Sequence, residues 1–247
     1  MDIFFGVDGC PNNRWIVVSC DSANYFQDAL IKENIQEIVD YTHGSTLILI
    51  DIPIGLKDNK QPGKRACDVE ARKILKKRAS SVFPAPQRES LQGQTWEEAY
   101  TINRKICEKG LSKQTWWIMK KIAQVDSILI HNVSLQSRFR ETHPEVCFWS
   151  LNDHQLMNYS KKSKYGINER LNVLDRLSRN ARAFYKQIRR QYKVKDVRSD
   201  DIIDAMVAAL SASLSGQYHL QTLPEIPQLD SHGLRMEIVF PNLQEIG

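Results

Sequence analysis

The first fifty residues alternate between apolar runs and turns, which predicts a β-sheet. Segments 2–7 (DIFFGV) and 14–20 (RWIVVSC) predict two strands joined by the turn GCPNN, and a shorter third strand is expected over 25–30. Apolar residues recur at helical spacing in 33–44, and the apolar run 46–51 (TLILID) then predicts a strand buried on both faces. The order predicts an antiparallel three-strand meander, with a further strand added in parallel through a helical crossover.

The middle of the chain changes to a helical period, which predicts a helical insertion at about 60–132. Prolines in the segment 80–91 (SSVFPAPQRESL) exclude regular helix there and predict an ordered surface loop. After the insertion, the segment 137–146 (SRFRETHPEV) returns to strand-like character before Pro144, where a short helix is expected to start with proline in its first turn. The remaining predicted elements are three helices and a last strand, at about 166–178, 180–192, 199–214 and 234–240. We therefore expect one α/β domain over 1–247, with a mixed sheet flanked by helices and a helical insertion.

Composition narrows the class of protein. The chain has 247 residues, 42% of them hydrophobic and 26% charged, as in ordinary globular proteins. It shows neither a signal-peptide pattern nor an apolar run long enough to span a membrane, so we expect a soluble cytoplasmic protein with no membrane partner. Its five cysteines lie far apart and form no C-x-x-C pair, which favours reduced thiols over a zinc site.

Carboxylates fall where the apolar runs stop. Asp8 and Asp51 end the first and fourth predicted strands, and Glu141 lies near the end of another. Asp201 and Asp204 are three residues apart, so they share one face at the start of the last helix. Because sites in open sheets are built at strand ends, we expect these five acids to meet if the first and fourth strands are neighbours.

Such a group of acids needs a counter-charge. Two unit charges 4 Å apart interact by about 4 kcal/mol at an effective dielectric near 20. Hard oxygen ligands suit Mg²⁺ or Mn²⁺, and a pair of these ions can activate water and stabilise the leaving oxygen of a phosphodiester. In this interpretation Asp8, Asp51, Asp201 and Asp204 bind metal, and the glycines on either side of Asp8, Gly6 and Gly9, let metal and phosphate approach the backbone.

Purely structural roles account for each acid taken alone. Asp200 and Asp201 stand in the first turn behind Ser199, where carboxylates cap free amides and favour the helix dipole. Asp8 between glycines also suits a turn, and Asp51 suits the end of a strand. Asp204 lies one turn further into the helix, so capping does not explain it. The joint pattern is therefore the stronger signal.

Basic residues suggest an anionic partner. The net charge is only +5, but lysines cluster in KKSK at 161–164, where Lys161 and Lys162 are candidates for binding phosphate. A solvated helix face is the alternative. Arg78, with Ser80 and Ser81, could form a phosphate-binding edge or belong to an exposed helix stripe, and the sequence leaves both open.

Together these motifs resemble those of a known family. GVDGC, IDIPIGL, RASSVFPAP, E-x-HPEV, DDIIDA and GLRMEIVFP are similar, over almost the whole chain, to an uncharacterised family described as predicted RNase H-like nucleases, domain of unknown function 429. The resemblance implies an RNase H-like fold. Junction resolvases of that fold carry acids on the first and fourth strands and a D-x-x-D-A pattern on the last helix. Asp8, Asp51, Asp201 and Asp204 match that scheme, with aspartate replacing the resolvases' glutamate on the fourth strand.

The expected function is hydrolysis of phosphodiester bonds in nucleic acid, dependent on Mg²⁺ or Mn²⁺, with DNA or RNA and the oligomeric state left open. The helical insertion and the RASSVFPAP loop have no counterpart in those nucleases. Two alternatives come from other classes. One is an actin-like ATPase, which usually needs two copies of this fold and gains no support from a Walker A or G-x-G-x-x-G motif. The other is a binding module for nucleotides or nucleic acid that does not cut.

Overall fold

The structure, a computed structural model, describes residues 2–243. Within it the chain forms two compact units. Unit 1 contains the residues up to 51, 137–221 and those from 239 onward, and unit 2 contains 52–136 and 222–238. The segment predicted as a helical insertion lies within unit 2. Unit 1 holds all the acids expected at the site.

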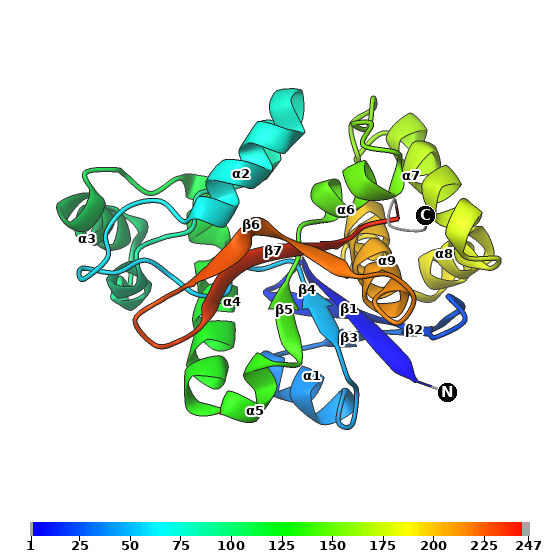
Figure 1. The fold of residues 1–247 in the computed structure, drawn as a ribbon, viewed down its shortest axis with the longest axis horizontal. Coiled ribbons are helices and arrows are strands. Elements are labelled where there is room, and N and C mark those ends of the chain that lie inside the picture. The colour runs from blue at the N-terminus through cyan, green and yellow to red at the C-terminus, as the bar shows by residue number, and fades with distance from the viewer. Residues whose placement is uncertain (1, 244–247) are drawn as a thin grey trace. The chain divides into compact units, whose positions relative to one another are not determined.

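Unit 1 is built on a five-stranded mixed sheet with the order β3-β2-β1-β4-β5 (Figure 1). The strands are β1 (Ile3–Cys10), β2 (Arg14–Asp21), β3 (Phe26–Lys32), β4 (Ile48–Ile50) and β5 (Phe139–Glu141). The first three form an antiparallel meander, and β4 pairs in parallel with both β1 and β5. The predicted mixed α/β sheet is confirmed, including the neighbouring position of the first and fourth strands.

Helices cover both faces of this sheet. On β1, Phe5 packs edge-on against Tyr41 of α1 (Ile35–Tyr41), whereas Phe4 packs against Ala208 and Ala212 of α9 (Ser199–Leu214). Successive residues of a strand point to opposite faces, so α1 and α9 lie on opposite sides of the sheet. The other helices of unit 1 are α6 (Pro144–Leu151), α7 (Lys164–Leu177) and α8 (Ala181–Gln191), and each contacts α9.

Gly6 lets α9 lie directly on β1. A Cβ atom at this position would be 2.1 Å from the backbone nitrogen of Ala209 and 2.2 Å from the carbonyl oxygen of Ala205. No side chain fits in that space, so only glycine permits this contact. The interpretation that Gly6 opens the backbone to metal or phosphate is therefore wrong, because the space above it is filled by the helix.

Unit 2 is mainly helical, as predicted for the middle of the chain. Its helices are α2 (Ala66–Leu75), η1 (Lys76–Ser81), η2 (Arg88–Gln92), α3 (Trp96–Cys107), α4 (Lys113–His131) and α5 (Val133–Gln136). Ala99, Leu111 and Met119 form a buried apolar cluster in it. The side chains of Thr95 and Ser112 cap the first turns of α3 and α4. The proline-rich segment between η1 and η2 contains no helix.

The strands β6 (Leu220–Leu229) and β7 (Arg235–Pro241) form a separate two-stranded sheet. The last strand was predicted, but the β6 segment was interpreted as a linker because it contains Pro224 and Pro227. A two-stranded sheet has free edges, which tolerate proline. Asp230 closes the turn between the strands by accepting hydrogen bonds from the backbone N–H groups of His232 and Leu234.

An ion-pair network holds this turn within unit 2. The Arg88 guanidinium contacts Asp126 of α4 at 2.8 Å and Asp230 at 2.5 Å. The same Asp230 carboxylate accepts a hydrogen bond from the backbone N–H of Leu56. Four segments distant in sequence are thereby fixed to one another.

Candidate active site

Sheet register places Asp8 and Asp51 side by side. Val7 is paired with Ile50, the last residue of β4, and the backbone N–H of Asp51 donates to the carbonyl of Val7 at 2.9 Å. The following residues on the two strands are Asp8 and Asp51, so their side chains emerge next to each other on the same face. That face also carries Phe4 and Gly6, so it is the one covered by α9.

The packing of α9 on β1 then brings in the helix acids. Phe4 packs against Ala208 and Ala212, and Gly6 lies against Ala205 and Ala209. Two residues of strand rise by about 6.6 Å, a little more than one helical turn of about 5.4 Å. Two residues further along β1 is Asp8, and one turn further toward the start of α9 are its first turns. These turns carry Asp201 and Asp204, so they lie at the level of Asp8.

Electrostatics confirm that these carboxylates act on one another. The pKa of Asp8 is raised well above its ordinary value by burial and then by the charges of Asp51, Asp204 and Asp201. Burial raises the pKa of Asp204 to about 6, although a neighbouring lysine opposes this. Burial is also the main cause of the raised pKa values of Asp51 and Asp201. The charges of the other three aspartates thus act on Asp8, and a shared metal site among them stays a prediction.

Lys161 places an ammonium group among these acids. Its ammonium nitrogen lies 2.5 Å from Oδ2 of Asp204. Burial lowers the pKa of Lys161, but the charges of Asp204, Asp8 and Asp51 outweigh that effect and raise it. Its side chain is 37% exposed, so the ammonium reaches the acids from the solvent side. The sequence placed Lys161 among phosphate-binding candidates and did not predict that it would neutralise the aspartates.

The loop that carries Lys161 is fixed by glycine and arginine. A Cβ on Gly166 would lie 1.9 Å from the carbonyl oxygen of Ser160, so this loop packs directly on the first turn of α7. Arg170, fully buried, donates to the carbonyls of Tyr159 and Gly166. Such close packing fixes the backbone next to Lys161. The packing of the loop therefore places Lys161 next to the aspartates.

Asp201 and Asp204 have different surroundings on α9. Asp201 Oδ2 accepts a hydrogen bond from the backbone N–H of Arg198 at 2.9 Å, the capping role that its position suggested. Asp204 is only 1% exposed, and within the described residues its Oδ1 atom is buried without a hydrogen-bond partner. A buried carboxylate oxygen without a hydrogen-bond partner is costly for folding.

Glu141 does not point toward the four aspartates. In the sheet it lies level with Ile50 and Val7, which are the residues just before Asp51 and Asp8. The alternation of a strand turns it to the opposite face. Glu145 of α6 acts on the site instead, because its charge contributes to raising the pKa values of Asp51 and Asp204.

Glu145 also connects the site to the lysine loop. Its carboxylate forms a buried salt bridge with Arg170, which in turn holds the backbone at Tyr159. In the sequence, His143-Pro144-Glu145 is as typical of a helix start as of a functional site. In the structure Pro144 does begin α6.

The other predicted substrate-binding residues are distributed over both units. Lys162 is exposed next to Lys161 in unit 1. Arg78, Ser80 and Ser81 belong to η1 in unit 2, where the Ser81 hydroxyl donates to the carbonyl of Arg78 at 2.8 Å. That bond stabilises the turn itself. A role for these residues in binding phosphate stays a prediction.

The donor set fits a hard divalent cation in kind and in charge. Its oxygens are carboxylate oxygens, one of them is buried and unpaired, and the acids outnumber the single ammonium. In the described part of the chain, however, no three His, Cys, Asp or Glu side chains are arranged around a common point as metal ligands. The Lys161 ammonium occupies the position beside Oδ2 of Asp204 in this structure.

Comparison with known proteins yields a family but no activity. The model of a family described as "Protein of unknown function (DUF429)" matches residues 6–228, a range that includes all the acids of the candidate site. No curated protein and no solved structure matches the chain. In the part that the structure describes, no helix has the length and apolarity needed to cross a bilayer.

Proposed function

Because the chain belongs to the DUF429 family, whose function is unknown, we propose a function from the site itself: hydrolysis of phosphodiester bonds in nucleic acid, dependent on Mg²⁺ or Mn²⁺. The observation that carries the proposal is a buried group of aspartates with raised pKa values and one ammonium to neutralise them. The resemblance of the motifs to RNase H-like nucleases supports the same chemistry.

The repulsion among the aspartates favours a bound divalent ion. Each close pair of carboxylates repels by about 4 kcal/mol at 4 Å and an effective dielectric near 20. Lys161 relieves part of this repulsion, yet the pKa of Asp204 is still raised to about 6. A fold that only needed to be stable would not keep these acids together. A divalent ion offers twice the charge of lysine and accepts several oxygen ligands at once.

Each residue has a distinct part in this proposal. Asp8, Asp51 and Asp204 hold the metal, while Asp201 adds negative charge and caps α9. When bound, the metal supplies an activated water and stabilises the charge that develops on the leaving oxygen. Lys161, released from Asp204, is then free to donate to a phosphate oxygen of the substrate.

Lys161 also favours a second candidate function. If its ammonium is the permanent counter-charge of Asp204, the protein keeps the acids without a metal and binds a nucleotide or nucleic acid without cutting it. The two candidates differ in metal dependence and in turnover, so one set of measurements separates them.

The test uses the full chain with labelled branched DNA, RNA–DNA hybrid and single-stranded substrates, with and without Mn²⁺. Asp8→Asn and Asp204→Asn are compared with Asp40→Asn, which changes an exposed carboxylate on α1. We expect cleavage that requires Mn²⁺ and falls at least about a hundredfold in both site variants, but not in the control.

Cleavage that survives both site substitutions would reject the proposed site. Tight binding of a substrate that is indifferent to Mn²⁺ and shows no turnover would favour the second candidate. Manganese binding is measured separately by thermal shift, because an ion that binds only the folded protein stabilises it by about 2.7 kcal/mol at a hundred times its Kd. This readout does not depend on choosing the right substrate.

A further inference from the structure

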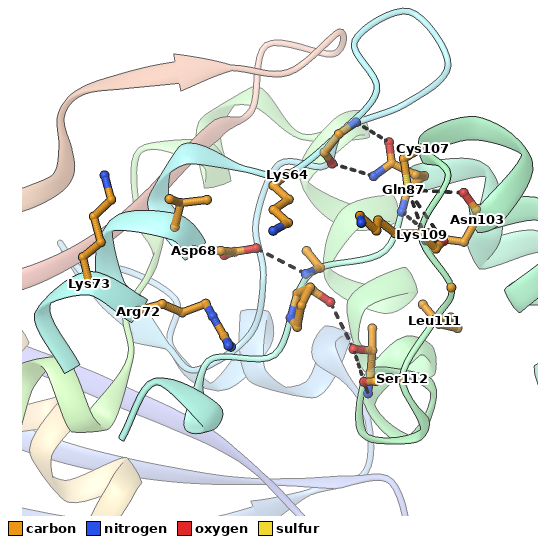
Figure 2. A pocket seen from close by; sticks show the side chains of 16 residues that line it. Lys64, Asp68, Arg72, Lys73, Gln87, Asn103, Cys107, Lys109, Leu111 and Ser112 are labelled. Carbon is orange, nitrogen blue, oxygen red and sulfur yellow. Dashed lines mark hydrogen bonds between the residues drawn. The ribbon is translucent and has the colours of Figure 1, made fainter. Parts of the chain in front are cut away.

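Unit 2 contains a cavity that the proposed chemistry of unit 1 does not use. Its volume is about 690 Å³, and it is bounded by α2, the proline-rich segment, the end of α3 and the start of α4 (Figure 2). Cavities that bind small molecules usually measure about 300–1,000 Å³. The size therefore suits a ligand as large as a nucleotide.

Basic side chains dominate the charged lining of this cavity. Four cationic residues and one acid line it, namely Lys64, Arg72, Lys73, Lys109 and Asp68. Asp68 is already neutralised, because it forms a buried salt bridge with Arg65. The lining therefore carries a clear excess of positive charge.

The cations have no acidic partner of their own. Within residues 2–243, the ammonium groups of Lys64 and Lys109 form no hydrogen bond or ion pair. Arg72 donates to the carbonyls of Ala79 and Val82, which are neutral acceptors. Figure 2 shows Lys64, Arg72 and Lys109 approaching the same space from different sides. Three cations facing one hollow are the complement of a ligand with several negative charges.

The amide side chains of the wall fix the backbone beside these cations. Both ends of the Gln87 side chain are bonded to Gly63, the residue before Lys64, with its Nε2 donating at 2.8 Å and its Oε1 accepting at 3.2 Å. Asn103 Nδ2 donates to the carbonyl of Lys109 at 2.9 Å, and Asn103 Oδ1 accepts from the Gln87 backbone at 2.8 Å. One hydrogen-bonded network thus holds the segments that carry both lysines.

Part of the remaining lining is apolar. Val69, Pro84, Ala85 and Leu111 all line the cavity, and Leu111 belongs to the buried cluster of this unit. A ring or short chain placed against them would be shielded from water, which is favourable at about 25 cal/mol per Å² buried. The cavity therefore offers one charged region and one apolar region to the same ligand.

We propose that this cavity binds a small phosphorylated molecule of nucleotide size. Its phosphate groups contact Lys64, Arg72 and Lys109, and its apolar or planar part lies against Val69 and Leu111. Several cations around one hollow favour a phosphate-bearing ligand over a singly charged carboxylate. The proposal is independent of the nuclease proposal, because every residue that it uses belongs to unit 2.

Calorimetric titration of the full chain with ADP, pyrophosphate and adenosine tests the proposal. The buffer contains EDTA, so a metal bound elsewhere plays no part. We expect saturable binding of ADP, weaker binding of pyrophosphate, which lacks a ring, and still weaker binding of adenosine, which lacks the charge. Lys64→Met and Lys109→Met are each expected to weaken ADP binding about tenfold, the usual loss for one charged hydrogen bond.

Lys105→Met is the matched control, because Lys105 is an exposed lysine of α3 outside the cavity lining. It is expected to change the Kd for ADP less than about twofold. Absence of saturable binding of both ADP and pyrophosphate up to about 1 mM would overturn the proposal. Equal affinity for adenosine and ADP would also overturn it, as would equal losses in Lys105→Met and Lys64→Met.

Discussion

Asp204 gives the sharpest test of the idea that the site is electrostatically strained. Its ordinary pKa is 3.8, and burial raises the pKa to about 6 in the folded protein. Each pKa unit corresponds to about 1.36 kcal/mol, so keeping this carboxylate ionised costs the folded state about 3 kcal/mol above pH 6. That figure already includes the attraction of Lys161, which lowers the pKa.

The direction in which stability changes with pH follows from the number of protons that the folded and unfolded states bind. Below pH 3.8 the carboxyl is protonated in both the folded and the unfolded state, so it costs nothing. Between pH 3.8 and about 6 the folded state binds more protons, and stability falls as the pH rises. Asp204→Asn removes the charge and should stabilise the protein by up to about 3 kcal/mol at pH 8, but by less than about 1 kcal/mol at pH 4.

Urea unfolding of both proteins at pH 4 and pH 8 measures this difference. Asp40→Asn, at an exposed position, should stay within about 0.5 kcal/mol of the parent at both pH values. Mn²⁺ should stabilise the parent protein and have a smaller effect on Asp204→Asn, which lacks one of the proposed ligands. A variant that is less stable than the parent at pH 8, or whose gain is the same at pH 4, would refute the reasoning.

Three further changes test the supporting structure. Gly6→Ala places a Cβ 2.1 Å from the backbone of Ala209, so it should destabilise the protein by at least about 3 kcal/mol in urea unfolding, and unchanged stability would contradict the helix contact. Glu145→Gln leaves the buried Arg170 without its ionic partner and should cost about 3 kcal/mol, seen as a lower Tm, whereas an unchanged Tm would contradict this. Lys161→Met should tighten Mn²⁺ binding at least about tenfold in a calorimetric titration, and weaker binding would show that the ammonium does not compete with the ion.

The sequence predicted those features of the fold that depend on local pattern. Apolar runs and helical spacing predicted the mixed sheet and the last helix, and the order of the strands predicted that Asp8 and Asp51 lie at neighbouring strand ends. These predictions succeeded because strand ends and helix faces follow directly from the period of the side chains. β6 was missed because its prolines are typical of linkers.

The rest of the site depends on contacts that no local pattern encodes. Glu141 was placed with the other acids, but a register that pairs it with Ile50 turns it to the other face of the sheet. A difference of one residue in register decides this, and the sequence does not specify it. Lys161 reaches Asp204 because its loop packs on Gly166. Such a long-range contact is visible only in the folded chain.

The residues of the site fall into two groups that respond differently to mutation. Gly6, Gly166 and Arg170 are explained by packing and hydrogen bonds, so changes at these positions should damage the fold and any activity together. Asp204 is not explained in this way, because one of its oxygens has no partner and its charge is unfavourable. In the proposed function, a bound divalent cation offsets that cost. A variant that becomes more stable while it loses metal binding would therefore mark Asp204 as a residue kept for function.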